Sequence, residues 1–389
     1  MKRILCLVLA ALMLMGAAAL AEEKETIKIA VVAPMTGDVA EYGQGFLTAV
    51  QIACDEVNAA GGLLDGRMVE IVSLDDKNSP DEGTLCADRI VSDGDICVVA
   101  VAHYSSTVAM AAAPIYQEAG IAAISASSSH LDYSSIGDYI FRNNVLSTQE
   151  SKNMLLYLIQ AGCKRIGVLK VMTDYGESAI ASLEEGLAEI GDGWDGEIVC
   201  VSEFTDGTVD FAPNITEFME AECDGVIIMG VYNNIAPFAL QLRETAPHME
   251  ISSIGGAYSN ELLELAGEAV EGMYIPVAFN PDRDDEAVQN FVNEYKARMN
   301  GYIPQSVVAQ AYENAYIVFQ AIERAGSTDR TAIRDALYET DYDGITGHVA
   351  FNENGDATKA QLKFQVVDGK FVEITGDQTW DEYIASING

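Results

Sequence analysis

The amino-acid sequence predicts an α/β fold with two doubly wound, Rossmann-like parallel sheets, each in its own domain. From residue 27 onward, short β-branched runs alternate with amphipathic helical patterns, which is typical of βαβ units. This alternation occurs twice, once before and once after residues 140–143. The chain of 389 residues is also longer than one hydrophobic core usually supports. We therefore expect two similar domains.

The first half predicts strands at residues 27–33, 69–74, 96–102 and 121–125. The helix after the first strand carries apolar residues at spacings of three and four from Phe46 to Val57, and Gly61-Gly62 ends it. We expect further helices near residues 84–92 and before residue 118.

The second half restarts with the segment Ser147-Thr148-Gln149-Glu150, which has the pattern of a capping box and predicts a helix to about residue 161. Strands are expected at residues 165–171, 198–202, 225–229, 251–254 and 273–276. These strands would form the second sheet.

The C-terminal third departs from this alternation. It predicts helices at residues 284–300, 305–325 and 329–338, then strands at 347–352 and 361–367, with hairpin-turn dipeptides at Asn354-Gly355 and Asp368-Gly369. We expect the chain to return to the first domain and to cross once more. One lobe would hold residues 22–143 and 277–346, the other 144–276 and 347–389, and the three crossings would form a hinge.

The first 21 residues have the pattern of a cleavable signal peptide. Lys2 and Arg3 precede an apolar run at residues 4–15, and Ala19-Leu20-Ala21 is an A-x-A cleavage site. The run is too short to span a bilayer. Because Glu22 follows the site and the only nearby thiol, Cys6, lies inside the leader, we expect an exported protein without a lipid anchor.

The charge of the chain excludes two classes of partner. The formal net charge is −38, and removal of Lys2 and Arg3 changes it to −40. Nucleic acids and anionic membranes are therefore not expected partners. The acidic surface either keeps the protein soluble or attracts cationic ligands.

Six cysteines remain after cleavage, and an oxidising compartment permits disulfides among them. Cys163 and Cys223 each precede a strand of the predicted second sheet, so they are the preferred pair, with buried free thiols as the alternative. The sequence contains no C-x-x-C pair and no zinc-ligand spacing, so we expect neither a metal nor another cofactor.

Ligands of open α/β sheets bind at the carboxyl ends of the strands, so residues that follow strands are the candidates for a site. In the first domain, these positions are rich in hydroxyls at Ser105, Ser106 and Thr107 and at residues 126–129. Hydroxyls beside a helix N-terminus predict an anion site. Alternatively, Ser106 or Thr107 only caps the helix.

Three tyrosines, Tyr42, Tyr175 and Tyr232, are expected at the same face, where aromatic walls suit a small-molecule cleft. The sequence has no G-x-S-x-G, H-E-x-x-H or Walker motif. His103 lies beside the serines, but no acid is placed to orient it. We therefore expect a binding protein and not a hydrolase.

Four segments resemble one family over nearly the whole mature chain. They are IKIAVVAPMTGDVAEYGQGFLTAVQIACDEVNAAGG, AAAPIYQEAGI, DYGES and EGMYIPVAF. They are similar to the leucine/isoleucine/valine-binding family of bacterial ABC importers, which has the type I periplasmic binding fold. The resemblance implies a periplasmic protein that holds its ligand between two lobes and docks on the permease subunits of a transporter. We expect it to be a monomer.

The resemblance also implies roles for individual residues. Ser106 matches a hydroxyl that binds the ligand carboxylate, and Ser127 and Ser129 match residues that hold its amine and carboxylate. Ala257 stands where amino-acid binders carry a carboxylate for the ligand ammonium. The predicted ligand-binding set is Tyr42, Ser105, Ser106, Ser127, Ser128, Ser129, Tyr175, Tyr232 and Ala257.

The alanine at position 257 leaves two possibilities for the ligand. Either Asp174 or Glu203 supplies the missing charge, or the ligand has no ammonium group. The sequence therefore predicts a transport-binding protein for a branched-chain or other apolar amino acid. The alternatives are a binder of an aromatic, keto or hydroxy acid, and an exported ligand sensor.

Overall fold

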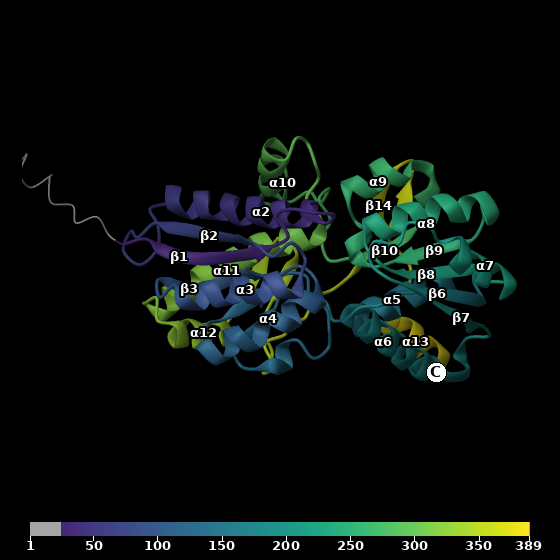
Figure 1. Cartoon of the computed structure of the whole chain (residues 1–389), viewed down its shortest axis with the longest axis horizontal. Helices are drawn as coiled ribbons and strands as arrows, with labels where there is room; N and C mark the ends of the chain where they lie inside the picture. Colours follow the sequence, from purple (N-terminus) through teal and green to yellow (C-terminus); the bar gives the residue numbers. More distant parts are fainter. Residues whose placement is uncertain (1–24, 389) are drawn as a thin grey trace, which may run out of the picture.

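The computed structural model describes residues 25–388 and contains two lobes, each built around its own sheet (Figure 1). The expected signal peptide, residues 1–21, lies outside the described residues. The first sheet contains β1 (Ile27–Ala33), β2 (Val69–Asp75), β3 (Ile96–Ala102), β4 (Ala123–Ser125) and β5 (Ile140–Arg142). Its strand order is β2-β1-β3-β4-β5 and all neighbours are parallel.

Helices cover both faces of the first sheet because both faces are apolar. On β1, Ile29 and Val31 pack with α2 (Ala40–Ala59) and α11 (Ser306–Ala325). The alternate residues Ala30 and Val32 pack with α3 (Pro80–Ser92) and α4 (Ser106–Ala119). This alternation follows from the two-residue period of a strand. The same lobe carries α10 (Glu286–Arg298) and α12 (Arg330–Tyr338).

The second lobe has a sheet of seven strands in the order β14-β13-β10-β9-β8-β6-β7. Its parallel strands are β6 (Arg165–Val171), β7 (Glu197–Phe204), β8 (Gly225–Met229), β9 (Glu250–Ser253) and β10 (Tyr274–Val277). The hairpin of β13 (Leu362–Val367) and β14 (Lys370–Ile374) joins antiparallel to β10. The helices are α5 (Ser147–Gln160), α6 (Asp174–Ile190), α7 (Ala212–Glu220), α8 (Tyr232–Thr245), α9 (Asn260–Ala266) and α13 (Trp380–Asn388).

The structure confirms the predicted fold class, and strands 27–33, 96–102, 165–171 and 225–229 have the predicted bounds. In both sheets the strand order reverses beside a central pair, at β1 and β3 in the first and at β6 and β8 in the second. The space beyond the carboxyl ends of such a pair is where open α/β sheets bind ligands. The fold therefore brings the carboxyl ends of both central strand pairs to one region between the lobes.

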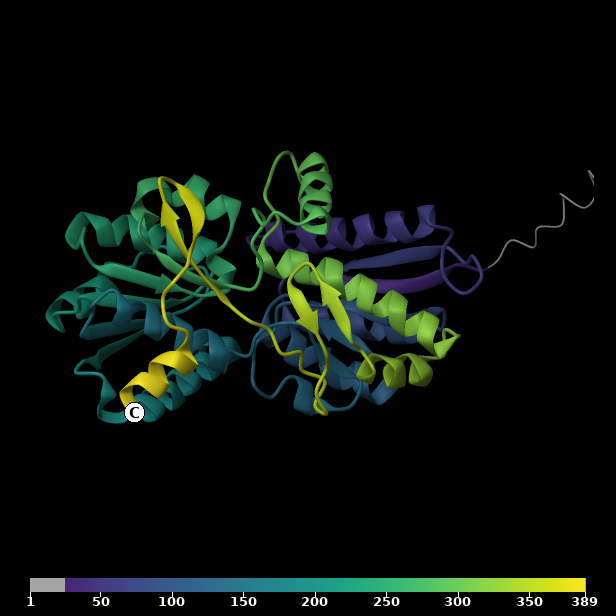
Figure 2. The same cartoon turned by 180° about the vertical axis from the view of Figure 1, so that it is seen from behind.

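The chain passes between the lobes three times, after β5, after β10 and after the hairpin of β11 (Tyr342–Gly344) and β12 (Gly347–Val349) (Figure 2). The third crossing begins later than the expected residue 347. Asp356 still pairs with Arg142 at the end of β5, and Ala357 with Phe351. We therefore propose that the first two lobe boundaries lie at residues 143 and 277, as expected, and that the third lies near residue 358.

The preferred disulfide between Cys163 and Cys223 is wrong, because all six cysteines of the described chain are free thiols. Cys163 packs in the apolar cluster that α5 and α6 form on one face of the second sheet. Cys223 packs against the cluster on the opposite face, with Phe218. The sheet therefore separates the two thiols.

Helices able to span a bilayer do not occur within residues 25–388.

Candidate ligand-binding site

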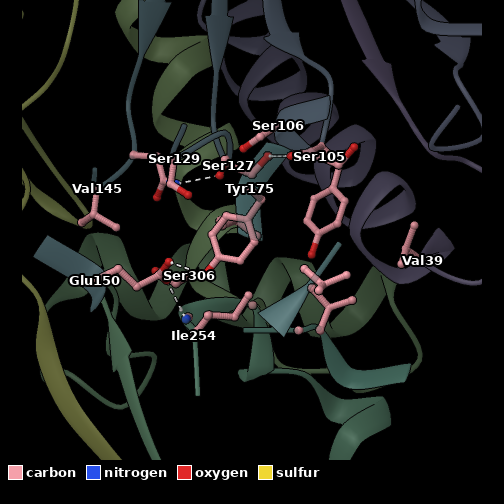
Figure 3. Close-up of a pocket in the computed structure, with 18 of the residues that line it drawn as sticks. Val39, Ser105, Ser106, Ser127, Ser129, Val145, Glu150, Tyr175, Ile254 and Ser306 are labelled. Carbon is pink, nitrogen blue, oxygen red and sulfur yellow. Dashed lines mark hydrogen bonds between the residues drawn. The ribbon is translucent and has the colours of Figure 1, made fainter. Parts of the chain in front are cut away.

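A cavity of about 220 Å³ lies between the lobes, at the carboxyl ends of the central strands of both sheets (Figure 3). The first lobe contributes loops after β1, β3 and β4 and the first turns of α4 and α11. The second lobe contributes loops after β6, β8 and β9 and the first turn of α5. Each lobe thus forms one wall, so a ligand there contacts both.

Serine hydroxyls and the N-terminus of α4 form one end of the cavity. Ser105, not Ser106 or Thr107, is the N-cap, and its hydroxyl accepts from the backbone N–H of Val108 at 3.4 Å. Ser106 is 4% exposed, and its oxygen accepts from the hydroxyl of Ser128 at 3.3 Å. The hydroxyl hydrogen of Ser106 is therefore available to a ligand anion. The N-terminus of α4 adds backbone N–H groups to the same end, an arrangement that is able to bind an anion.

Ser127 and Ser129 line the same end from the loop after β4 (Figure 3). Ser127 donates its hydroxyl hydrogen to the carbonyl oxygen of Tyr104 at 2.7 Å. Its remaining lone pairs can accept a hydrogen bond but its proton is already used. Ser128, which was also predicted from the sequence, does not line the cavity; it is fully buried and supports Ser106 from behind.

The side walls between these groups are largely aliphatic. Both lobes contribute branched side chains, and most of them are buried against their own lobe. They are Val39, Val145, Val171, Val231, Ile254, Val277 and Val307. Such walls favour an apolar ligand side chain.

Of the three predicted tyrosines, only Tyr175 lines the cavity. Tyr42 is fully buried and stacks on Tyr104, with ring centroids 4.2 Å apart, so Tyr104 forms the wall in its place. Tyr42 donates its hydroxyl to the carbonyl oxygen of Gly256 in the other lobe. Tyr232 likewise donates to the carbonyl oxygen of Asp38 at 2.6 Å. These two tyrosines bridge the lobes.

Glu41 strengthens this bridge. Its carboxylate accepts from the hydroxyl of Ser259 at 2.5 Å and from the amide of Asn260 at 3.3 Å, both in the second lobe. Burial raises the pKa of Glu41. Because these contacts cross from one lobe to the other beside the cavity, the lobes are closed around it.

Glu150 is a cavity residue that was not predicted from the sequence (Figure 3). The predicted capping box is wrong, because the N-cap of α5 is Leu146 and no side chain caps the helix. The hydroxyl of Ser147 instead contacts those of Ser178 and Ser182 at 2.8 and 3.1 Å. These tertiary contacts leave the Glu150 side chain free to turn toward the cleft.

The carboxylate of Glu150 has two protein partners. It accepts from the backbone N–H of Gly255 at 2.9 Å and from the hydroxyl of Tyr175 at 3.2 Å. The residue is only 6% exposed, and burial raises its pKa, while these two hydrogen bonds act in the opposite direction. Among the described residues that line the cavity, none is lysine, arginine or histidine. The second lining carboxylate, Asp206, is exposed.

The structure places Ala257 away from the ligand space. It is fully buried in the core and does not line the cavity, although its neighbours Gly255 and Gly256 do. Neither expected substitute lines the cavity either: Glu203 forms an ion pair with Lys170 at 2.7 Å, and Asp174 begins α6. The buried carboxylate of the cleft comes from α5 instead.

Glu150→Gln is expected to stabilise the ligand-free protein at neutral pH. Below the ordinary carboxyl pKa of 4.5, glutamate and glutamine are both neutral and the two proteins should be equally stable. Because the pKa of Glu150 is raised in the folded state, the wild type loses stability relative to the variant as the pH rises from 4.5 through that folded pKa. Urea unfolding at several pH values measures the difference in stability between the two proteins. A difference that does not change with pH would contradict a raised pKa of Glu150 in the folded state.

An acid does orient His103, which was not expected from the sequence, but the histidine cannot activate the serines of this site. Its Nδ1 lies 2.8 Å from a carboxylate oxygen of Asp76, and its Nε2 lies 3.1 Å from the hydroxyl of Tyr116. Both ring nitrogens are therefore occupied behind the cavity. Within residues 25–388, no cluster of three or more His, Cys, Asp or Glu side chains is arranged to hold a metal ion.

Relatives of known binding activity cover most of this chain. The leucine-, isoleucine-, valine-, threonine- and alanine-binding protein of Pseudomonas aeruginosa is 27% identical over 352 residues, which cover 89% of this chain and 91% of the relative. The substrate-binding protein of a branched-chain amino acid transporter from Streptococcus pneumoniae, solved with isoleucine, is 25% identical. Its TM-score is 0.82, and the match covers 90% of this chain and all of that one (100%).

A third likeness concerns the fold alone. An ABC transporter solute-binding protein from R. palustris, solved with benzoate, is 18% identical with a TM-score of 0.81, covering 91% of this chain and 98% of that one. The family model described as periplasmic binding protein matches residues 26–370. This match spans most of the sequence and both lobes, so the chain belongs to the periplasmic binding protein family.

Proposed function

We propose that this protein is the solute-binding component of an ABC importer and binds a branched-chain or other apolar amino acid between its lobes. In this proposal it acts as a monomer in the periplasm and delivers its ligand to the permease subunits of the transporter. It catalyses no reaction.

The observation that carries the proposal is the hydroxyl-rich end of the interlobe cavity at the N-terminus of α4. The hydroxyl of Ser106, the hydroxyl of Ser129 and the first turn of α4 face the same space. Together they suit a carboxylate without requiring lysine or arginine. The aliphatic walls then favour an apolar remainder, and the closed lobes would bury most of the ligand.

Two relatives support the amino-acid assignment by what they bind. One is a binding protein for leucine, isoleucine, valine, threonine and alanine, and the other was solved with isoleucine. The direct test is a thermal-shift screen of the purified protein with the apolar amino acids and their keto analogues. A ligand at 100 times its Kd should stabilise the fold by about 2.7 kcal/mol. No shift with any of these compounds would contradict the proposal.

Ser106→Ala should weaken binding of the stabilising ligand by about tenfold or more, because a hydrogen bond to a charged group contributes about 1.5–3 kcal/mol. Isothermal titration calorimetry measures the change. Ser92→Ala is the matched control: Ser92 is exposed and bonds only to Asp88 of its own helix at 2.7 Å. Equal affinities of the wild type and Ser106→Ala would show that the ligand carboxylate does not bind at this end of the cavity.

A further inference from the structure

We propose that Glu150 binds the α-ammonium group of the ligand, so that the cavity selects zwitterionic amino acids over acids that lack the amine. This inference rests on the proposed function and adds the group that decides the class of ligand. The charge partner comes from the first turn of α5, not from the loop after β9 where Ala257 lies.

The hydrogen bonds of Glu150 leave acceptor capacity on the side of the cavity. An ionised carboxylate offers about four lone-pair positions. Gly255 uses one on Oε1 and Tyr175 uses one on Oε2. These two bonds fix the orientation of the group. Figure 3 shows Glu150 and Ser106 on opposite sides of the Tyr175 ring, with the cavity between them.

The charges in the cavity match a zwitterion. The Glu150 carboxylate is almost fully buried, and the described lining residues include no cationic side chain. A buried anion without a cation is costly. A ligand ammonium would supply this cation, while the carboxylate of the same ligand binds beside Ser106. A keto acid or benzoate would instead place a second anion in the same enclosed space.

Ser127 is suited to assist the same ammonium. Its hydroxyl hydrogen is already donated to the carbonyl oxygen of Tyr104, so toward the cavity it can only accept a hydrogen bond. An ammonium needs three acceptors for its hydrogens, and Glu150 and Ser127 both provide oxygens to the cavity. A ligand that lacks the amine has no donor for these oxygens.

The experiment compares Glu150→Gln with the wild type by titration calorimetry at pH 7.5. The probes are alanine, valine and leucine and their keto analogues pyruvate, 3-methyl-2-oxobutanoate and 4-methyl-2-oxopentanoate. Glu150→Gln should weaken the tightest amino acid by about 100-fold, because it removes one partner of a buried charge pair. The affinity for the matching keto acid should stay within about threefold of the wild type or increase.

Glu353→Gln is the matched control, since it makes the same substitution at a glutamate that is exposed to solvent and does not line the cavity. It should change amino-acid affinity by less than about threefold, because water and salt screen an exposed charge. A circular dichroism melt checks that each variant folds. The wild type gives a second measurement: its amino-acid affinity should fall as the pH is lowered and Glu150 takes up a proton.

The outcomes separate the two proposals. If the wild type binds amino acids and Glu150→Gln binds them within about threefold as tightly, the role of Glu150 is wrong while solute binding stands. Keto acids that bind the wild type as tightly as amino acids would overturn the inference in the same way. If the wild type binds none of the six compounds, the proposed function itself fails and the inference falls with it.

Discussion

Asp356→Ala is expected to lower the free energy of unfolding by about 3–5 kcal/mol, since it leaves a buried charge without its partner. The Arg142 side chain is fully buried, and burial lowers its pKa. Asp356 Oδ1 accepts from Arg142 Nε at 2.9 Å and from the hydroxyl of Ser134 at 2.7 Å. After the substitution, the guanidinium would keep carbonyl and hydroxyl oxygens as partners but no anion.

Urea unfolding measures this loss. Asp341→Ala is the control, because its carboxylate is 87% exposed and lies 3.7 Å from His348 at the surface, so the expected change is within about 0.5 kcal/mol. A loss below about 1 kcal/mol for Asp356→Ala would mean that the third crossing is not held to the first lobe by this pair.

Gly176→Ala is expected to have the second largest effect, a loss of about 3 kcal/mol in stability together with weaker ligand binding. A Cβ at this position would lie 1.9 Å from the carbonyl oxygen of Val171, so the first turn of α6 must move away from the end of β6. That turn carries Tyr175, whose hydroxyl is 3.2 Å from the Glu150 carboxylate. The displacement would disturb both the aromatic wall and the orientation of Glu150.

Thermal unfolding and ligand titration of Gly176→Ala measure the two effects. Gly94→Ala is the matched control because nothing lies within 4 Å of the position that its Cβ would take, and its backbone is outside the left-handed region. Its stability should stay within about 0.5 kcal/mol of the wild type. Equal stability of the two alanine variants would show that α6 can move away from the end of β6 without a loss of stability.

The sequence was sufficient for the central strands of both sheets and for the serines that lie at one end of the cavity. Strand β3 is a continuous apolar run that is buried on both faces, and such runs are recognisable without tertiary information. The serines after β3 and β4 follow from the rule that ligands bind at the carboxyl ends of parallel strands. Ser105, Ser106, Ser127 and Ser129 accordingly line the cavity.

The sequence was insufficient to predict the hydrogen-bond partners of side chains that can bind either a neighbouring residue or a distant one. The segment from Ser147 to Glu150 satisfies the capping-box pattern, but Ser147 pairs with two serines of α6 and Glu150 reaches Gly255, 105 residues away in sequence. Tyr42 and Tyr232 were expected in the cavity wall for the same reason. Their hydroxyls instead donate to carbonyl oxygens of the opposite lobe, which is visible only when the lobes are placed together. These contacts depend on the tertiary structure, so local sequence patterns do not predict them.

The identity of the ligand that the protein retains is the most direct test of whether the interlobe cavity holds a zwitterionic apolar amino acid. The protein is purified without denaturation, the bound compound is released by acid, and mass spectrometry identifies and quantifies it. We expect an apolar α-amino acid, and adding it back to ligand-free protein should raise the melting temperature. Recovery of an aromatic or keto acid without an amine, with no shift by any amino acid, would contradict this expectation.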